Sequence, residues 1–88
     1  MVSDICDFTN QRPTLKRGSS GVAVKQMQCY LNSSLTGDGL DVDGDFGPVT
    51  HEALRRFQGC ADITVDGICG AQSWSHLTLW ANSPDFVC

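Results

Sequence analysis

The feature that most constrains how this chain can fold is a nine-residue motif that occurs twice. The first copy is residues 42–50 (VDGDFGPVT), and the second, 23 residues later, is residues 65–73 (VDGICGAQS). Leu54 and Leu77 align in the same register. An Asp-Gly pair favours a tight turn, because the carboxylate accepts hydrogen bonds from amides two residues on and glycine tolerates positive φ. Each copy therefore predicts a turn that leads directly into a helix.

Hydrophobic periodicity predicts three short helices joined by glycine-rich loops. The first spans residues 20–33 with Ser20 as its N-cap, the second runs from Pro48 to a stop at Gly59, and the third spans residues 71–81. Their expected inner faces are Val24, Met27 and Leu31, then Val49, Ala53, Leu54 and Phe57, then Trp74, Leu77 and Ala81. Between the first two helices we expect a loop with a short extended piece near residues 40–42. The fold class predicted is an all-α three-helix bundle with Asp-Gly loops.

The cysteines predict covalent support for a small core. A chain of 88 residues forms a single domain, residues 1–88, whose burial alone gives marginal stability. Five cysteines without a C-x-x-C pair favour disulfides in an oxidising compartment over a zinc site. An odd number leaves one thiol over, and the spacing leaves the pairing open. Residues 1–4 do not resemble a signal peptide, so we interpret the chain as a mature form with an added Met; an intracellular protein with unpaired thiols is the alternative.

Charge and composition exclude several classes of function. Ten acidic and six basic side chains give a net charge of −4, which disfavours a nucleic-acid partner. No apolar run is long enough to span a membrane. The two histidines, His51 and His76, do not occupy equivalent positions in the repeat, and a small bundle offers no deep cleft for a glycosidase pair. A Cys69–histidine nucleophile is disfavoured by the oxidising context. We therefore predict no enzyme and no cofactor.

The acidic cluster before the second helix permits a calcium interpretation, which the spacing then disfavours. Asp41, Asp43 and Asp45 fall at positions 1, 3 and 5 of an EF-hand loop, and Glu52 falls at position 12. The sixth position requires glycine for a sharp turn and is Phe46 here. We therefore assign no metal ligand.

The ordered motifs between residues 15 and 77 resemble the small three-helix peptidoglycan-binding domain of many secreted bacterial cell-wall hydrolases. The matching residues are Leu15-Lys16-Arg17-Gly18-Ser19-Ser20-Gly21, Val24, Met27-Gln28, Leu31-Asn32, Val42-Asp43-Gly44-Asp45-Phe46-Gly47-Pro48, Thr50, Ala53, Phe57-Gln58, Val65-Asp66-Gly67-Ile68, Gly70, Ser73-Trp74 and Leu77. The chain departs from the family pattern at Met27, usually leucine, and at Cys69, usually aliphatic. The resemblance implies a secreted, non-catalytic module that binds the wall polymer, through either the glycan strand or the stem peptide.

The resemblance also implies a disulfide pattern. Similar secreted members bridge an N-terminal and a C-terminal cysteine, so the implied pair is Cys6–Cys88. Cys29 and Cys60 then form the second pair, and Cys69 is left as a semi-buried thiol. A Cys60–Cys69 bridge is the chief competing arrangement.

The expected ligand site is a shallow groove formed by the Asp-Gly loops and the start of the second helix. Its candidate contact residues are Arg17, Asp43, Asp45, Phe46, Thr50 and Trp74. The polar members would hydrogen-bond acetamido sugars or the stem peptide, and the aromatic edges would supply apolar contact. Gln28 and Gln58 are interpreted as buried amides that satisfy loop backbone groups, and Asp43 and Asp66 primarily as turn residues.

Two other functions fit the same residues. One is a protein-interaction module that kept the fold and lost the sugar, acting as an inhibitor or targeting partner of a separate cell-wall hydrolase. The other is a fragment of a larger hydrolase.

Overall fold

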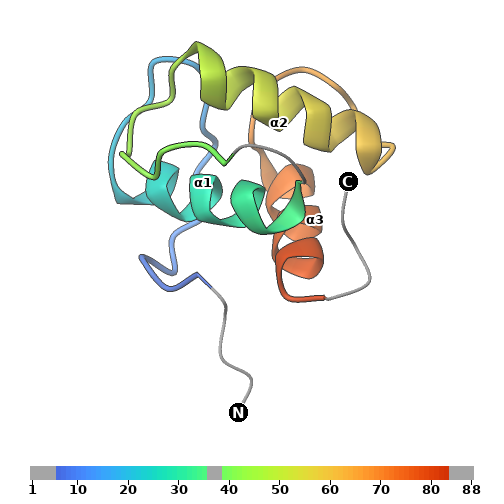
Figure 1. The fold of residues 1–88 in the computed structure, drawn as a ribbon, viewed down its shortest axis with the longest axis horizontal. Coiled ribbons are helices and arrows are strands. Elements are labelled where there is room, and N and C mark those ends of the chain that lie inside the picture. Colours follow the sequence, from blue (N-terminus) through green and yellow to red (C-terminus); the bar gives the residue numbers. More distant parts are fainter. Residues whose placement is uncertain (1–5, 36–38, 84–88) are drawn as a thin grey trace.

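In the computed structural model, which describes residues 6–35 and 39–83, three α-helices pack around one core (Figure 1). The helices are α1 (Val22–Ser34), α2 (Pro48–Cys60) and α3 (Ala71–Ala81). α1 packs against both α2 and α3. The described ranges contain no β-strand, and none of their helices is long and apolar enough to cross a membrane. The all-α, three-helix prediction is confirmed.

Short backbone pairings tie both copies of the repeat to the segment before α1. Leu15 and Cys69 exchange two backbone hydrogen bonds, of 3.0 and 2.8 Å. In the first copy, the N–H of Phe46 donates to the carbonyl of Ser19, and the N–H of Gly18 donates to the carbonyl of Phe46, both at 3.0 Å. Phe46 and Cys69 are counterparts in the repeat, so each copy is anchored through the same position.

Each helix begins immediately after a glycine. Gly21, Gly47 and Gly70 are the N-cap residues, and none of the three caps carries a side-chain hydrogen bond. The prediction that Ser20 caps the first helix is therefore wrong. Ser20 lies in a β-bridge to the first loop. Gly21 makes the turn into the helix with a φ of 119°, a backbone conformation that is unfavourable for residues with a side chain.

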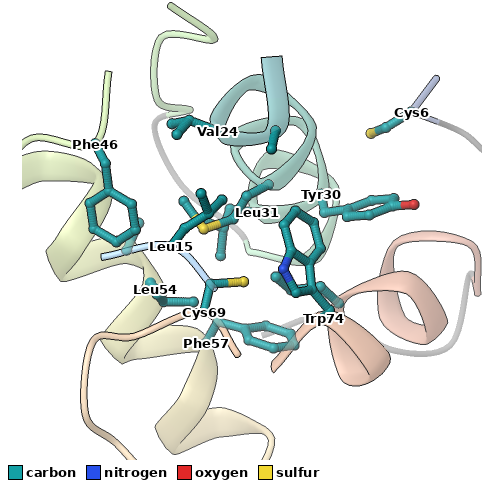
Figure 2. Close-up of a cluster of buried hydrophobic side chains, with 14 of the residues drawn as sticks. Cys6, Leu15, Val24, Tyr30, Leu31, Phe46, Leu54, Phe57, Cys69 and Trp74 are labelled. Atoms are coloured by element: carbon teal, nitrogen blue, oxygen red, sulfur yellow. The ribbon is translucent and has the colours of Figure 1, made fainter. Parts of the chain in front are cut away.

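The core is built from one face of each helix together with loop residues such as Leu15, Phe46 and Cys69 (Figure 2). On α3 the predicted stripe of Trp74, Leu77 and Ala81 is buried as expected. Leu15 and Cys69 lie near each other in this view, in line with the backbone pairing between their segments.

The buried face of α2 differs from the prediction by one position. Ala53, Leu54 and Phe57 are buried as predicted, but Val49 is 71% exposed and the neighbouring Thr50 is buried in its place. Neighbouring residues on an α-helix point about 100° apart, so with Thr50 directed into the core Val49 lies at the edge of the buried face and is left exposed. The Thr50 hydroxyl faces inward because it accepts a hydrogen bond from a buried glutamine of α1.

The N-terminal segment is fastened along α1 by buried polar contacts. The side-chain oxygen of Gln26 accepts a hydrogen bond of 2.7 Å from the N–H of Phe8, and its Nε2 donates to the carbonyl of Cys6 at 2.7 Å. The guanidinium of Arg12 lies over the Trp74 ring, 5.1 Å from its centroid. This segment therefore covers one side of the bundle rather than trailing from it.

The two disulfide pairs implied by the family resemblance are wrong, whereas the expectation that Cys69 is left as a free thiol is confirmed. Cys6 is bonded to Cys29, which excludes both Cys6–Cys88 and Cys29–Cys60. Cys60 is also disulfide-bonded, and Cys88 lies outside the described residues. Cys69 is a free, buried thiol, which excludes the competing Cys60–Cys69 bridge. The observed pair is explained by the position of the N-terminal segment along α1. A buried glutamine one helical turn before Cys29 donates a hydrogen bond to the Cys6 carbonyl, and this contact brings Cys6 close to Cys29.

We expect the Cys6–Cys29 bridge to be a principal source of stability. Replacing both residues by alanine opens a link with a sequence separation of 23 residues. Loop-closure entropy predicts that the free energy of unfolding falls by about 3 kcal/mol. Urea denaturation of the oxidised proteins, followed by circular dichroism, measures this loss. A change below about 0.5 kcal/mol, the range of neutral surface substitutions, would show that the polar contacts hold the segment without the bridge.

Candidate binding groove

The amide of Gln28, buried in α1, organises the first Asp-Gly loop. Its Nε2 lies 3.0 Å from Asp43 Oδ1, 3.0 Å from the carbonyl of Asp45 and 3.1 Å from Thr50 Oγ1. Its Oε1 accepts a hydrogen bond of 3.0 Å from the N–H of Gly44. One side chain thus joins α1, the loop and the first turn of α2. The prediction that this amide serves loop backbone groups is confirmed.

Gln58 does the same for the second loop from α2. Its Nε2 lies 2.9 Å from Asp66 Oδ1, 3.0 Å from the carbonyl of Ile68 and 3.1 Å from Ser73 Oγ. Its Oε1 accepts a hydrogen bond of 2.9 Å from the N–H of Gly67. The partners match those of the first loop position by position, so the sequence repeat is also a repeat of hydrogen bonds.

Asp43 and Asp66 are the turn residues of the two loops. Asp43 Oδ1 accepts the N–H of Asp45 and Asp66 Oδ1 accepts the N–H of Ile68, both at 2.9 Å. These backbone donors, with the glutamine amides second, lower the pKa of both carboxyl groups below the ordinary value of 3.8. Both loops are therefore built around an ionised carboxylate at neutral pH.

The glycine after each turn aspartate is required by its backbone and its surroundings. Gly44 and Gly67 have φ values of 79° and 71°. A Cβ at Gly44 would lie 3.1 Å from the carbonyl oxygen of Gly21, and one at Gly67 would collide with the ring of His51. His51 therefore packs on the second loop, which disfavours a catalytic role for it at an open site.

Two adjoining hollows open beside the first loop and the outer face of α2. The larger, about 380 Å³, is lined by Leu40, Pro48, Val49, Glu52, Ala53 and Arg56. The smaller, about 230 Å³, is lined by Leu40, Asp41, Asp43, Asp45, Gly47, Pro48, Val49 and Thr50. They share Leu40, Pro48 and Val49 and therefore lie side by side, and we call the two together the α2 groove.

Asn32 of α1 positions the loop edge of the α2 groove. Its Oδ1 accepts a hydrogen bond of 2.7 Å from the N–H of Leu40, and its Nδ2 donates to the Leu40 carbonyl at 2.9 Å. This two-bond contact holds Leu40 beside both hollows. Together with the Gln28 network, it ties both ends of the described loop, residues 39–47, to α1.

Three of the predicted contact residues meet in the α2 groove. Asp43, Asp45 and Thr50 all line the smaller hollow. The two aspartates are exposed, whereas Thr50 is only 4% exposed and its hydroxyl is engaged by Gln28. The aspartates thus present carboxylates to solvent, and Thr50 shapes the floor.

The other three predicted contact residues lie elsewhere. Phe46 and Trp74 are each 3% exposed and belong to the core. Trp74 is covered by Arg12, and its indole N–H donates to the carbonyl of Pro13 at 2.7 Å. Arg17 is exposed but lines neither hollow. Their roles in ligand binding stay predictions, and this geometry gives the aromatic pair little surface to offer.

Several residues of the α2 groove were not singled out from the sequence. They are Leu40, Pro48, Val49, Glu52, Ala53 and Arg56. The repeat itself offers a signal, because a residue in one copy can be compared with its counterpart in the other. Thr50 and Ser73 are both buried against a glutamine, and the residue before each is exposed. The second copy has Gln72 at that outward position, whereas the first has a valine.

The described residues include the free thiol of Cys69 and side chains of the types that bind metal ions. Cys69 is fully buried, and burial raises the pKa of its thiol to about 12, so it is protonated at neutral pH. Within residues 6–35 and 39–83, no group of three His, Cys, Asp or Glu side chains is arranged to hold a metal ion.

Comparison with known proteins identifies related domains. A family model described as "Putative peptidoglycan binding domain" matches residues 20–77. An uncharacterised protein from the bpoA1 3′ region of Kitasatospora aureofaciens is 43% identical over 76 residues, which cover 85% of this chain and 64% of that protein. The zinc D-Ala-D-Ala carboxypeptidase of Streptomyces albus G is 42% identical over 65 residues, 73% of this chain and 26% of the enzyme. This chain thus spans less than two thirds of either relative.

A solved structure shows the same architecture. The N-terminal domain of SleB superposes with a TM-score of 0.68 at 39% identity. The match covers 88% of this chain and 100% of that domain.

We predict that the Gln28 amide is essential to the first loop. Gln28→Met keeps the side-chain length but leaves the buried N–H of Gly44 without its acceptor. The expected loss in the free energy of unfolding is about 3 kcal/mol, measured by urea denaturation. Gln72→Met, at an exposed helical glutamine, is the control and is expected to change it by less than about 0.5 kcal/mol. Equal effects of the two substitutions would contradict the proposed network.

The lowered pKa values of the two turn carboxylates predict that the folded protein loses stability in acid. Because the folded pKa values of Asp43 and Asp66 lie below 3.8, their contribution is present above that value and is lost as pH falls through the folded pKa values. Asn keeps an acceptor without the charge, so the Asp43→Asn/Asp66→Asn variant should lose less stability than the wild type as pH falls below about 4. Denaturation midpoints between pH 7 and pH 2 test this. Parallel curves for the two proteins would contradict it.

Proposed function

The chain belongs to the peptidoglycan-binding domain family, and we propose that it binds the bacterial cell wall non-covalently through the α2 groove. The observation on which the choice of surface rests is the adjacency of the two hollows, which places apolar side chains of α2 beside exposed carboxylates. Apolar lining with a few convergent polar groups is typical of ligand sites.

The α2 groove is supported as a binding surface by how firmly its walls are held. Gln28 and Asn32 tie the loop to α1, and Pro48 begins the rigid helix that forms the other wall. A site that is ordered before binding loses less conformational freedom when the ligand arrives. We therefore expect the free and bound loops to have the same conformation.

We assign the chain a binding role and no reaction of its own. The aligned residues make up 26% of the carboxypeptidase, so that enzyme's activity is not transferred to this chain. The buried, protonated thiol of Cys69 is a poor nucleophile. Catalysis on the wall would then belong to another domain or another protein.

We place the protein outside the cytoplasm, at the cell wall. The Cys6–Cys29 disulfide supports an oxidising compartment. With a net charge of −4, long-range attraction to an anionic wall does not drive binding, so we expect modest affinity at each site. The wall repeats its chemical units, and multiple engaged copies would strengthen attachment.

A cell-wall hydrolase is the second candidate partner. The exposed Val49, with the apolar groove around it, is a surface that a segment of another protein could also cover. In that case the same groove would bind the hydrolase and target or inhibit it.

Co-sedimentation with purified, teichoic-acid-free sacculi tests the proposed site. Val49→Lys places a long side chain across the groove at an exposed position, where stability is unaffected. We expect its apparent Kd to rise about tenfold, equivalent to about 1.4 kcal/mol.

The matched control is Gln72→Lys, the same substitution at the counterpart position in the second copy. It should bind sacculi as the wild type does. If Gln72→Lys weakens binding more than Val49→Lys, the site is on the second loop. Absence of saturable pelleting by folded wild-type protein would contradict wall binding, and retention of a hydrolase from culture supernatant would then support the second candidate.

A further inference from the structure

We propose that the α2 groove takes the stem peptide of peptidoglycan rather than its glycan strand, with a cationic amine of the stem against Asp41 and Asp45 and its aliphatic part along Val49 and Ala53. This inference rests on the proposed function and specifies which part of the polymer is bound. A stem peptide combines small aliphatic residues with a diamino acid whose second amine is charged wherever it is not cross-linked.

The two hollows of the α2 groove differ in the side chains that line them. The larger one is walled by the aliphatic groups of Leu40, Pro48, Val49 and Ala53, with Glu52 and Arg56 along its margin. The smaller one, which shares Val49 with it, is lined by three aspartates. The two together favour a ligand that is aliphatic along one part and cationic at the other.

The smaller hollow is acidic. Asp41, Asp43 and Asp45 are all exposed at the smaller hollow. Asp43 already accepts the Gln28 amide and is near Lys25, whose charge acts on it. Asp41 and Asp45 are consequently the members best placed for an incoming ammonium group. Charge-assisted hydrogen bonds favour such a group over neutral hydroxyl or acetamido groups.

The α2 groove offers no aromatic ring to a ligand. None of the described residues that line the groove is aromatic. The nearby Phe46 and Phe57 are buried in the core, as Figure 2 shows. A sugar face thus meets no flat apolar partner here.

The length of the groove fits a short peptide. Val49 and Arg56 are two turns apart on α2, a distance of about 10 Å along the helix axis. An extended chain advances about 3.3–3.6 Å per residue, so this side of the α2 groove has room for about three residues. A segment of a stem peptide therefore fits along it, and the choice between stem and glycan rests on the lining groups and not on the length.

Three preparations of one batch of sacculi separate the possibilities: intact sacculi, sacculi whose amines are acetylated, and glycan stripped of stems by an amidase. We expect wild-type protein to bind intact sacculi at least about fivefold more tightly than either treated form, in low salt. Asp41→Asn/Asp45→Asn should weaken binding to intact sacculi by a similar factor and leave binding to acetylated sacculi unchanged. Asp62→Asn, at an exposed aspartate beyond the far end of α2, is the matched control and should bind intact sacculi as the wild type does.

Each result decides one of the two proposals. Equal binding of wild-type protein to all three preparations would overturn the stem-peptide inference and leave wall binding intact. Loss on stripped glycan without loss on acetylated sacculi would overturn the cationic contact. Failure to bind any preparation would overturn the proposed function itself. Because the sacculi are modified rather than the protein, these three outcomes do not depend on how any variant folds.

Discussion

The structure depends on two buried amide side chains that hold loops to helices. Each Asp-Gly turn exposes backbone groups on a side that faces the core, and an unmatched buried N–H or carbonyl is costly. Gln28 and Gln58 supply donors and an acceptor to the two turns with the same partners in each copy. The turn aspartates, the positive-φ glycines and the inward Thr50 or Ser73 follow from that single requirement. These polar contacts fix the two loops relative to α1 and α2.

The parts of the fold that could be predicted from sequence are those set by local rules. The repeat, the proline at the start of α2 and the apolar periodicity were sufficient to predict three helices and two turns. The first cap and the outer position of Val49 were mispredicted because tertiary contacts decide them: Ser20 pairs with the first loop, and Thr50 is turned inward by Gln28. The disulfide was mispredicted for the same reason, since the fastening of the N-terminal segment along α1 is not visible in cysteine spacing.

The candidate site was predictable in location but not in composition. The first loop and the start of α2 were expected to form a groove, and Asp43 and Asp45 do line it. Phe46 and Trp74 were expected to be mostly core residues with a ring edge on the groove. Both are buried in the core of this small domain, and neither lines a hollow. The apolar wall instead comes from the outer face of α2. Such an apolar surface could not be predicted from the amphipathic pattern of the helix, because a single exposed valine is ordinary on a protein surface.

The most direct test of the central claim is a ¹H–¹⁵N correlation titration of the oxidised protein with a soluble disaccharide-tetrapeptide released from sacculi. The account predicts saturable shifts in the amides of Leu40, Val49 and Glu52, because these residues line the groove, with residues 65–73 unaffected. The two loops have separate hydrogen-bond networks of the same pattern, so the second serves as an internal control for general effects. Shifts centred on the second loop, or none in the groove at saturation, would contradict the account.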